Sequence, residues 1–382
     1  MTRRFFCVVF ISFTLLQFCA NQEIPNYTLD DVSIIIDIKK AEDCNSLKFC
    51  NIRFLPLETN RDCLIGEPSK ILFRNDKIYV ADFHKAEALF VFDASGKFLF
   101  KNAKKGKGPG EYLSFTDFDI HTNGDVYLYD NWGSKIEVYA PDGKYLRTIK
   151  QDYRLLNICL VENNIYLHHL YDAKMIAALA VNEMDSKRIN FLMKDKRFLH
   201  DMDLKHSNYS FYDSQGGVVY YAPKFSSIVY SINSEGVHPA IGVNNLRRAP
   251  ENIVQEYLQT RQKSSKAFEI ITDRPYFWEI VYVYEIENYI SMRIIMGGPH
   301  YYQTLFYDKR KGIACFASPF DFIRDIGFAL SKIMGSTGKE FFSVVDFDSE
   351  NTIHQKILQT RKDLSNWKEE DNPVIILFDL EM

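Results

Sequence analysis

The 382-residue chain lacks the short motifs that most directly identify an enzyme. None of its seven cysteines forms a Cys-x-x-Cys pair, which argues against a structural zinc site. It contains no Gly-x-Ser-x-Gly nucleophile elbow and no phosphate loop ending in Gly-Lys-Ser/Thr. The hydrolase and nucleotide-binding classes that depend on these motifs are therefore excluded.

An excess of positive charge is also missing. The chain has 46 basic and 50 acidic residues, and loss of Arg3 and Arg4 with the leader would change the net charge from −4 to −6. Nonspecific nucleic-acid binding needs a basic surface, so we expect no nucleic-acid partner. A hydrophobic content of 46%, with 30 Phe and 23 Tyr, instead indicates a folded protein rich in strands.

Long hydrophobic runs are absent except near the N-terminus. Residues 1–20 are predicted to be a signal peptide, with Arg3 and Arg4 before the apolar stretch Phe5–Leu16. That stretch is too short to span a bilayer, and no later one reaches the roughly 18 apolar residues that a membrane helix needs. We therefore expect an exported protein.

The end of the leader resembles a bacterial lipobox. Leu16 stands three residues before Cys19, although Phe18 occupies a position where small residues are usual. This predicts lipid attachment at Cys19, which would anchor the protein to a membrane in the periplasm or at the outer membrane. The alternative is cleavage after Ala20 to give a secreted protein, but Phe18 also fits that cleavage poorly.

Five cysteines remain beyond Cys19, so at least one is unpaired within the chain. Export makes disulfides possible. Cys44 and Cys50 are close enough in sequence to pair, whereas Cys159 and Cys315 are expected to be buried and unpaired.

A repeat of nearly fifty residues is the strongest pattern in the sequence. Lys77–Asp82 recurs 48 residues later as Asp125–Asp130, and Ala88–Leu99 recurs 47 residues later as Lys135–Leu146. Each unit contains four predicted strands, which in the first unit are Ser69–Phe73, Ile78–Ala81, Leu89–Phe92 and Lys97–Phe100. Four-stranded antiparallel units of about 45 residues are typical of β-propeller blades.

Weaker copies of the unit follow. Their most recognisable strands are Asn164–Leu167, Gly217–Tyr221, Trp278–Tyr284, and the pair Phe341–Asp346 and Val374–Leu380. Ile52–Leu57 precedes the first clear blade and is expected to complete the last one, which would close the ring without a free edge. Two insertions, Pro250–Lys266 and Asn351–Trp367, have helical spacing of apolar residues. We therefore expect an all-β fold in which residues 21–382 form a single six-bladed β-propeller of four-stranded antiparallel blades.

Two segments of the first blade, Ile78–Asp82 and Val91–Phe98, resemble the NHL-type repeat. Three further segments are similar to six-bladed propeller proteins abundant in Bacteroides-type gut bacteria: Phe54–Thr59, Gly106–Tyr112 and Asn372–Val374. The resemblance is strong over roughly residues 52–150 and weaker beyond. It implies an exported lipoprotein with six blades. Other NHL propellers bind proteins or RNA and a few are lyases, so the resemblance hardly constrains function.

Several residues are candidates for ligand binding. The glycines of Gly106–Gly110, with Lys105 and Lys107, could hold an anion, or could simply form a turn between blades. Aromatic rings on loops could stack on sugars, or could pack in the core. The full set of candidates is His84, Lys105, Lys107, Trp132, Trp278 and Tyr301.

Asp82 and Asp130 end equivalent strands and are expected to accept backbone hydrogen bonds from the following turns. The alternative is a ring of carboxylates around a divalent cation such as calcium in the central channel. No other cofactor is expected.

These patterns favour a noncatalytic binding or scaffold module, expected to be a monomer, for a glycan, peptide or partner protein at the loop face. The alternative is a metal-assisted lyase or hydrolase with its site at the central channel. An enzyme would need several catalytic side chains from different blades to converge. Divergence of the repeats after residue 150 favours that half of the chain as the place of function.

Overall fold

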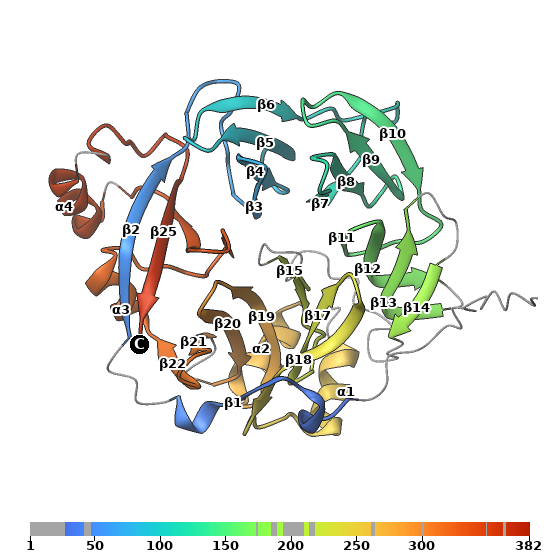
Figure 1. Cartoon of the computed structure of the whole chain (residues 1–382), viewed down its shortest axis with the longest axis vertical. Helices are drawn as coiled ribbons and strands as arrows, with labels where there is room; N and C mark the ends of the chain where they lie inside the picture. The colour runs from blue at the N-terminus through green and yellow to red at the C-terminus, as the bar shows by residue number, and fades with distance from the viewer. Residues whose placement is uncertain are drawn as a thin grey trace, which may run out of the picture.

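In the computed structural model, six β-sheets are arranged as blades around a central axis (Figure 1). The structure describes residues 27–41, 47–172, 175–184, 189–193, 210–213, 218–260, 264–298, 302–348, 350–361 and 364–382. The signal peptide with Cys19, and also Cys44, lie outside these residues. No helix in the described part of the chain is long and apolar enough to cross a membrane.

The blades follow one another along the chain, each as an antiparallel meander that begins at the axis. Blade 1 contains β3 (Lys70–Arg74), β4 (Lys77–Asp82), β5 (Ala88–Asp93) and β6 (Phe98–Asn102). Blade 2 contains β7 (Phe115–Ile120), β8 (Val126–Asp130), β9 (Lys135–Tyr139) and β10 (Tyr145–Lys150). Blade 3 contains β11 (Asn157–Val161), β12 (Asn164–Asp172), β13 (Met175–Glu183) and β14 (Ile189–Met193).

Blade 4 contains β15 (Phe211–Asp213), β16 (Val219–Tyr221), β17 (Ile228–Asn233) and β18 (Gly236–Asn244). Blade 5 contains β19 (Phe277–Glu285), β20 (Tyr289–Met296), β21 (Tyr302–Asp308) and β22 (Ile313–Ala317). Blade 6 contains β23 (Gly335–Ser336), β24 (Phe341–Val345), β25 (Val374–Glu381) and, from the other end of the chain, β2 (Lys48–Pro56). The expected six-bladed propeller is confirmed.

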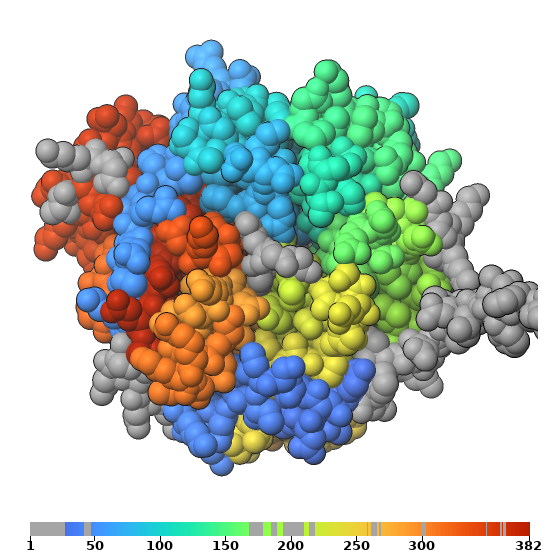
Figure 2. All heavy atoms as spheres, viewed as in Figure 1, coloured from blue at the N-terminus to red at the C-terminus, as the bar shows by residue number. Residues whose placement is uncertain are grey.

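Hydrophobic side chains between the blades hold the ring together. The middle strands β4 and β8 are buried along almost their whole length, because both faces of each sheet pack against a neighbouring blade. A lone blade could not bury both faces, so stacking around the axis is what stabilises each sheet. The space-filling view shows neighbouring blades packed directly against each other (Figure 2).

The two ends of the chain close the ring. β2 pairs antiparallel with β25, from Lys48 opposite Glu381 to Pro56 opposite Val374. This confirms the expectation that the segment around Ile52–Leu57 completes the last blade.

An additional strand lies before β2. β1 (Ile34–Asp37) pairs in parallel with β18 and gives blade 4 five strands instead of four. Two short 3-10 helices, η1 (Leu29–Asp31) and η2 (Ile38–Lys40), flank it. In Figures 1 and 2 this blue segment lies against the outside of blade 4.

The helices differ from the sequence expectation in extent. The predicted helix over Pro250–Lys266 is two helices, α1 (Glu251–Thr260) and α2 (Ser264–Asp273), and α4 (Thr352–Thr360) is shorter than predicted. α3 (Pro319–Asp325) was not predicted. It begins with Pro319 after Ser318, and Asp321 accepts hydrogen bonds from the backbone and side chain of Ser318, which together form a capping box.

The cysteine expectations were wrong at two positions. Cys315 is disulfide-bonded, and its partner lies outside the described residues. Cys50 is free, as are Cys63 and the buried Cys159. The proposed pairing of Cys44 with Cys50 is therefore excluded. Closeness in sequence was a poor guide because the bonded partner of Cys315 is distant in the chain.

Candidate functional site

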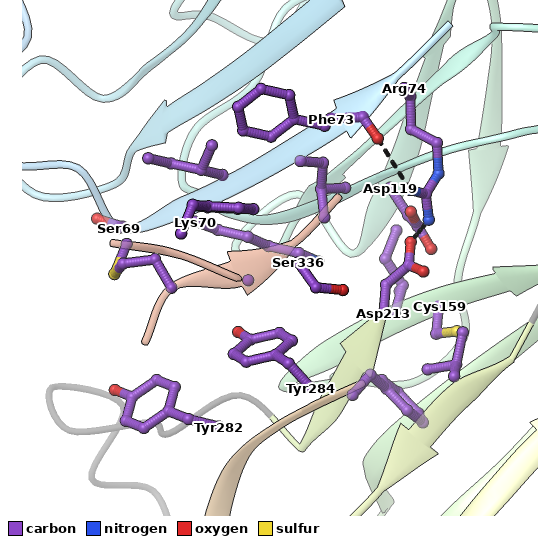
Figure 3. Close-up of a pocket in the computed structure, with 18 residues that line it drawn as sticks. Ser69, Lys70, Phe73, Arg74, Asp119, Cys159, Asp213, Tyr282, Tyr284 and Ser336 are labelled. Atoms are coloured by element: carbon purple, nitrogen blue, oxygen red, sulfur yellow. Dashed lines mark hydrogen bonds and ion pairs between the residues drawn. The ribbon is translucent and has the colours of Figure 1, made fainter. Parts of the chain in front are cut away.

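A pocket lies on the propeller axis, where the innermost strands of all six blades meet. Its cavity volume is about 30 Å³, and the wider space around this cavity, about 610 Å³, is partly open solvent. β3 provides one wall, and β7, β11, β15, β19 and β23 contribute the others. Figure 3 shows the side chains around this space, which include Lys70, Arg74, Asp213, Tyr284 and Ser336.

Lys70 is the first cationic group of the pocket. Its Nζ lies 2.8 Å from Asp117 Oδ1 and donates to the carbonyl oxygen of Phe118 at 2.6 Å. Burial alone would lower the pKa of Lys70, but the carboxylates of Asp117 and Asp119 outweigh it and raise the pKa. Lys70 is therefore a charged group whose position is fixed by blade 2.

Arg74 is the second cationic group, four residues further along β3. It forms an ion pair with Asp213 of β15, across the axis from its own blade, and donates to the Phe73 carbonyl at 2.9 Å (Figure 3). Burial lowers the pKa of its guanidinium. This pair joins blades 1 and 4, which are not neighbours in the ring.

Two carboxylates of blade 2 form hydrogen bonds to the backbone of the neighbouring blade. Asp117 Oδ2 accepts from the backbone N–H of Ile158 at 2.9 Å, and Asp119 Oδ2 accepts from Leu160 at 2.7 Å. Both bonds reach β11 of the next blade. These carboxylates connect blades 2 and 3 and are held in place by that role.

Ser336 is the least satisfied polar side chain of the pocket. It is only 3% exposed, and its hydroxyl has no hydrogen-bond partner among the described residues. Buried hydroxyls are normally paired, so an unpaired one that lines a pocket is a candidate ligand contact. In Figure 3 it lies between the Arg74–Asp213 pair and Tyr284.

Tyr282 has an unusual backbone conformation. Its φ of 54° is in the left-handed region, and the pairing of β19 with β20 shifts register between Val281 and Tyr284. Such a bulge changes the direction of the side chains that follow it and is often found next to active sites. Both Tyr282 and Tyr284 line the pocket as a result.

Cys159 lies at the wall formed by blade 3. Burial and the nearby carboxylate of Asp119 raise the pKa of its thiol well above the ordinary value. The thiol is therefore protonated at neutral pH and is unsuited to act as a nucleophile.

The glycine-rich segment that could hold an anion is already filled by the protein. Glu111 Oε2 accepts from the backbone N–H of Gly108 at 2.9 Å, and a Cβ on Gly106 would lie 1.9 Å from the same oxygen. Lys105 pairs with Glu87, whereas Lys107 is exposed. The segment is a turn between blades 1 and 2, closed by an internal carboxylate.

Three of the other candidate residues are spread over the molecule. His84 and Trp132 are exposed on the loops after β4 and β8, and Trp132 is 71% exposed. Trp278 is instead fully buried, with its ring 5.4 Å from that of Tyr257 on α1. It anchors the helical insertion and presents no ring to a ligand. Tyr301 lies outside the described residues.

The structural role expected for the two strand-ending aspartates is confirmed. Asp82 accepts four backbone N–H groups, those of Gly66, Glu67, His84 and Lys85. Asp130 accepts from Leu113, Ser114 and Gly133. Among the described residues, no group of three His, Cys, Asp or Glu side chains is arranged to hold a metal.

The pocket residues themselves were not among the sequence candidates. Lys70 and Arg74 stand at the two ends of an otherwise apolar strand, where charged residues usually face solvent. The available signal was their place on the first strand of a blade, because that strand borders the axis of any propeller.

Comparisons with known proteins support the fold. The sequence profile of a family described as a domain of unknown function (DUF4934) matches residues 33–379. A Bacteroides fragilis protein, provisionally described as exported, is similar in structure with a TM-score of 0.72 and 17% identity. The alignment covers 91% of this chain and 99% of that protein.

A Bacteroides vulgatus member of the duf4221 family has a TM-score of 0.54 and 11% identity, over 89% of this chain and 99% of that one. Virginiamycin B lyase from Staphylococcus aureus is more distant, with a TM-score of 0.39, 12% identity, and coverage of 78% and 82%. A likeness that weak carries no argument about chemistry. A search of curated protein sequences found no match.

Proposed function

The chain belongs to the family described as a domain of unknown function (DUF4934), and since that description assigns no activity, we propose a function from the pocket itself. The protein is an exported binding module that holds a small polar ligand in its central pocket without chemical change. A sugar unit is the ligand chemistry that the lining favours.

The observation that supports this most strongly is the hydroxyl of Ser336, which has no hydrogen-bond partner among the residues that the structure describes. It is buried beside two tyrosine rings and two charged pairs, in a pocket to which every blade contributes. Ligand sites commonly combine apolar or aromatic walls with a few fixed polar groups. Sugars match that combination because one face of the ring stacks on aromatic side chains while the hydroxyls form hydrogen bonds.

A binding role is favoured over catalysis by how the ionisable groups are held. Asp117 and Asp119 already accept backbone N–H groups, and the thiol of Cys159 is kept protonated by burial. A general base or nucleophile needs to be free to exchange a proton with the ligand.

Screening of a panel of monosaccharides against the full chain by ligand-observed NMR tests the proposal. Binding should weaken about fivefold or more in Ser336→Ala, because one hydrogen bond is lost. Ser291→Ala is the matched control, since Ser291 is also a buried serine without a partner in the described part but lies outside the pocket. Absence of sugar binding, or an equal effect of both variants, would contradict the proposal.

Export and lipid attachment at Cys19 form the second part of the proposal. The leader pattern supports both, and the disulfide at Cys315 fits an oxidising compartment. The expected result is membrane-bound protein that becomes soluble after Cys19→Ala. An unprocessed chain that stays in the cytoplasm would contradict export, whereas soluble exported wild-type protein would contradict only the lipid anchor.

A second candidate site is the loop face of blades 1 and 2. Trp132 and Leu113 are both exposed, and Asp130 accepts from the backbone N–H groups of Leu113 and of Gly133, the residue after Trp132. A partner protein or glycan bound there would lose affinity in Trp132→Ala but not in Ser336→Ala. The two variants therefore separate the candidate sites.

A further inference from the structure

The cavity on the propeller axis is much smaller than the ligand proposed for it. Its volume of about 30 Å³ is enough for about two water molecules. The wider space of about 610 Å³ is partly open solvent, so the room for a larger ligand lies beside the cavity and not within it. A sugar unit can enter only if a side chain that lines the cavity moves aside.

One ion pair crosses the propeller axis. The innermost strands lie side by side around the ring in the order β3, β7, β11, β15, β19 and β23. Blades 1 and 4 are therefore opposite each other, and the ion pair of Arg74 on β3 with Asp213 on β15 spans the channel between them (Figure 3). A contact between opposite blades obstructs the channel, whereas a contact between neighbouring blades leaves it open.

The pair lies at one end of this channel. Each blade adds four antiparallel strands before the next begins at the axis, so all six innermost strands run in the same direction. Arg74 and Asp213 are the last residues of their strands, whereas Ser69 and Met334 directly precede β3 and β23 at the other end of the pocket. The side chains of the pair are 22% and 13% exposed, as expected at a channel mouth. The pair therefore closes one mouth of the pocket.

The pair can separate without movement of the strands that carry it. Arg74 has a long unbranched side chain, and its guanidinium also donates to the carbonyl oxygen of Phe73 at 2.9 Å, so it keeps this partner when it leaves Asp213. Ion pairs with access to solvent are weak, because water replaces the lost contact and salt screens the attraction. A contact of this kind is suited to open and close.

We propose that the Arg74–Asp213 pair is a latch that must open before a ligand of the size of a sugar unit enters the central pocket. This inference rests on the proposed function and adds the step that admits its ligand. The structure is then the closed state of the pocket. In that state the hydroxyl of Ser336 has no partner among the described residues, and opening of the latch makes it accessible to the ligand.

Cys159 makes it possible to observe opening without a ligand. It is free, 2% exposed and lines the pocket on the same side as the pair (Figure 3). N-ethylmaleimide is uncharged and larger than the closed cavity, so it should reach this thiol only after the pair opens. Cys63 is also free and buried but lies outside the pocket, so its labelling reports opening of the fold as a whole.

The experiment follows the labelling rates of both cysteines in the full chain by peptide mass spectrometry. Asp213→Asn and Arg74→Met should each accelerate labelling of Cys159 about fivefold, because loss of one ion pair shifts an opening equilibrium by about that factor, and should leave Cys63 unchanged. The charge of Arg74 lowers the pKa of the Cys159 thiol, so its loss alone would leave less thiolate and slow the reaction. Faster labelling in Arg74→Met therefore reports access to the thiol and not its reactivity.

Salt and a matched control test whether the ion pair is responsible. High salt should accelerate labelling of Cys159 in the wild type, because it screens the pair, and should have little effect in either variant. Arg53→Met is the control, because it breaks the ion pair of Arg53 with Glu340, which lies outside the pocket. Labelling of Cys159 should not change in this control.

Failure of the latch and failure of the proposed function are distinguishable. Unchanged labelling of Cys159 in both variants would overturn the latch, even where the monosaccharide screen detects binding. Equal acceleration at Cys159 and Cys63 would also overturn it, because the pair would then only stabilise the fold. Selective acceleration at Cys159 without sugar binding would support the latch and contradict the sugar as its ligand.

Discussion

In this propeller, single buried side chains hold the loops between strands in place through hydrogen bonds. Asp82 is the clearest example, because it is fully buried and accepts four backbone N–H groups from two separate loops. Burial alone would raise its pKa, but these hydrogen bonds outweigh burial and lower it below the ordinary value of 3.8. The carboxylate therefore contributes to stability only while it is ionised.

Asp82→Asn should lower the free energy of unfolding by about 2 kcal/mol near pH 7, because charge-assisted hydrogen bonds become neutral or are lost. The folded pKa is depressed, so this contribution is present above the unfolded pKa and is lost as pH falls through the folded one. Urea unfolding at several pH values should therefore show wild type and variant converging below about pH 4. Asp152→Asn removes an exposed carboxylate and is the control. A difference in unfolding free energy between wild type and variant that persists into strong acid would contradict this explanation.

At the level of elements, the regular blades could be predicted from the sequence and the insertions only in part. β4 and β8 lie within a residue of the predicted strands, because alternation, turn glycines and the repeat spacing all agree there. β1 was missed because Ile34–Asp37 is a short apolar run without a repeat partner. α3 was missed although Ser318 and Pro319 carry a helix-start signal, because seven residues are too few for helical periodicity.

The central pocket could not be predicted from local patterns. Its residues come from all six blades, spread along the chain from Ser69 to Phe342. Lys70 and Arg74 become pocket residues only because Asp117 and Asp213 of other blades hold them at the axis. Such pairings depend on the ring as a whole. The glycine-rich turn is the opposite case, since the turn alternative was already evident in the sequence.

The glycine-rich turn allows a test of whether Glu111 is the reason for a glycine at position 106. A methyl group at Gly106 would meet the carboxylate of Glu111, so Gly106→Ala should destabilise the protein by about 1–3 kcal/mol. In a Glu111→Ala background the same change should cost much less, because the clashing oxygen is gone. Unfolding free energies of the single and double variants form the cycle. Additive costs would mean that the glycine is required for another reason.

Across the whole molecule, the N-terminal segment is fastened to several blades. β1 pairs with blade 4, the carbonyl oxygen of Ala41 accepts from Phe316 of blade 5, and β2 completes blade 6. Cys315, next to Phe316, is disulfide-bonded, and Cys44 is the cysteine that follows Ala41 most closely in sequence. We therefore expect Cys44 to be its partner.

Peptide mapping without reduction should recover Cys44 and Cys315 in one linked species. Cys315→Ser should lower the free energy of unfolding by about 2–4 kcal/mol, because the bond closes a long loop. A reducing agent should destabilise the wild type by a similar amount and leave the variant unchanged. Cys50→Ser, which alters a free thiol, is the control. A link to any other cysteine would contradict the predicted pairing.

Closure of the ring depends on one asparagine near the C-terminus. The Nδ2 of Asn372 donates to the carbonyl oxygens of Glu58 and Cys63, each at 2.7 Å, and its Oδ1 accepts from Ile65 at 2.8 Å. The side chain is 1% exposed, and all three of these hydrogen bonds are made to the segment between β2 and β3. It thereby holds the two ends of the chain together beside the paired strands β2 and β25.

Asn372→Asp should therefore lower the free energy of unfolding by about 3 kcal/mol, because one carboxylate oxygen would replace the amide nitrogen that makes both donations and would face the two carbonyl oxygens. Unfolding of the variant should begin where β2 pairs with β25. Amide hydrogen exchange should therefore accelerate in β2 and β25 more than in β8 and β12. Asn75→Asp changes an exposed asparagine in the turn between β3 and β4 and should have little effect. If exchange instead accelerated equally in all blades, the ring would open only by global unfolding, and Asn372 would stabilise the propeller without acting as its closing contact.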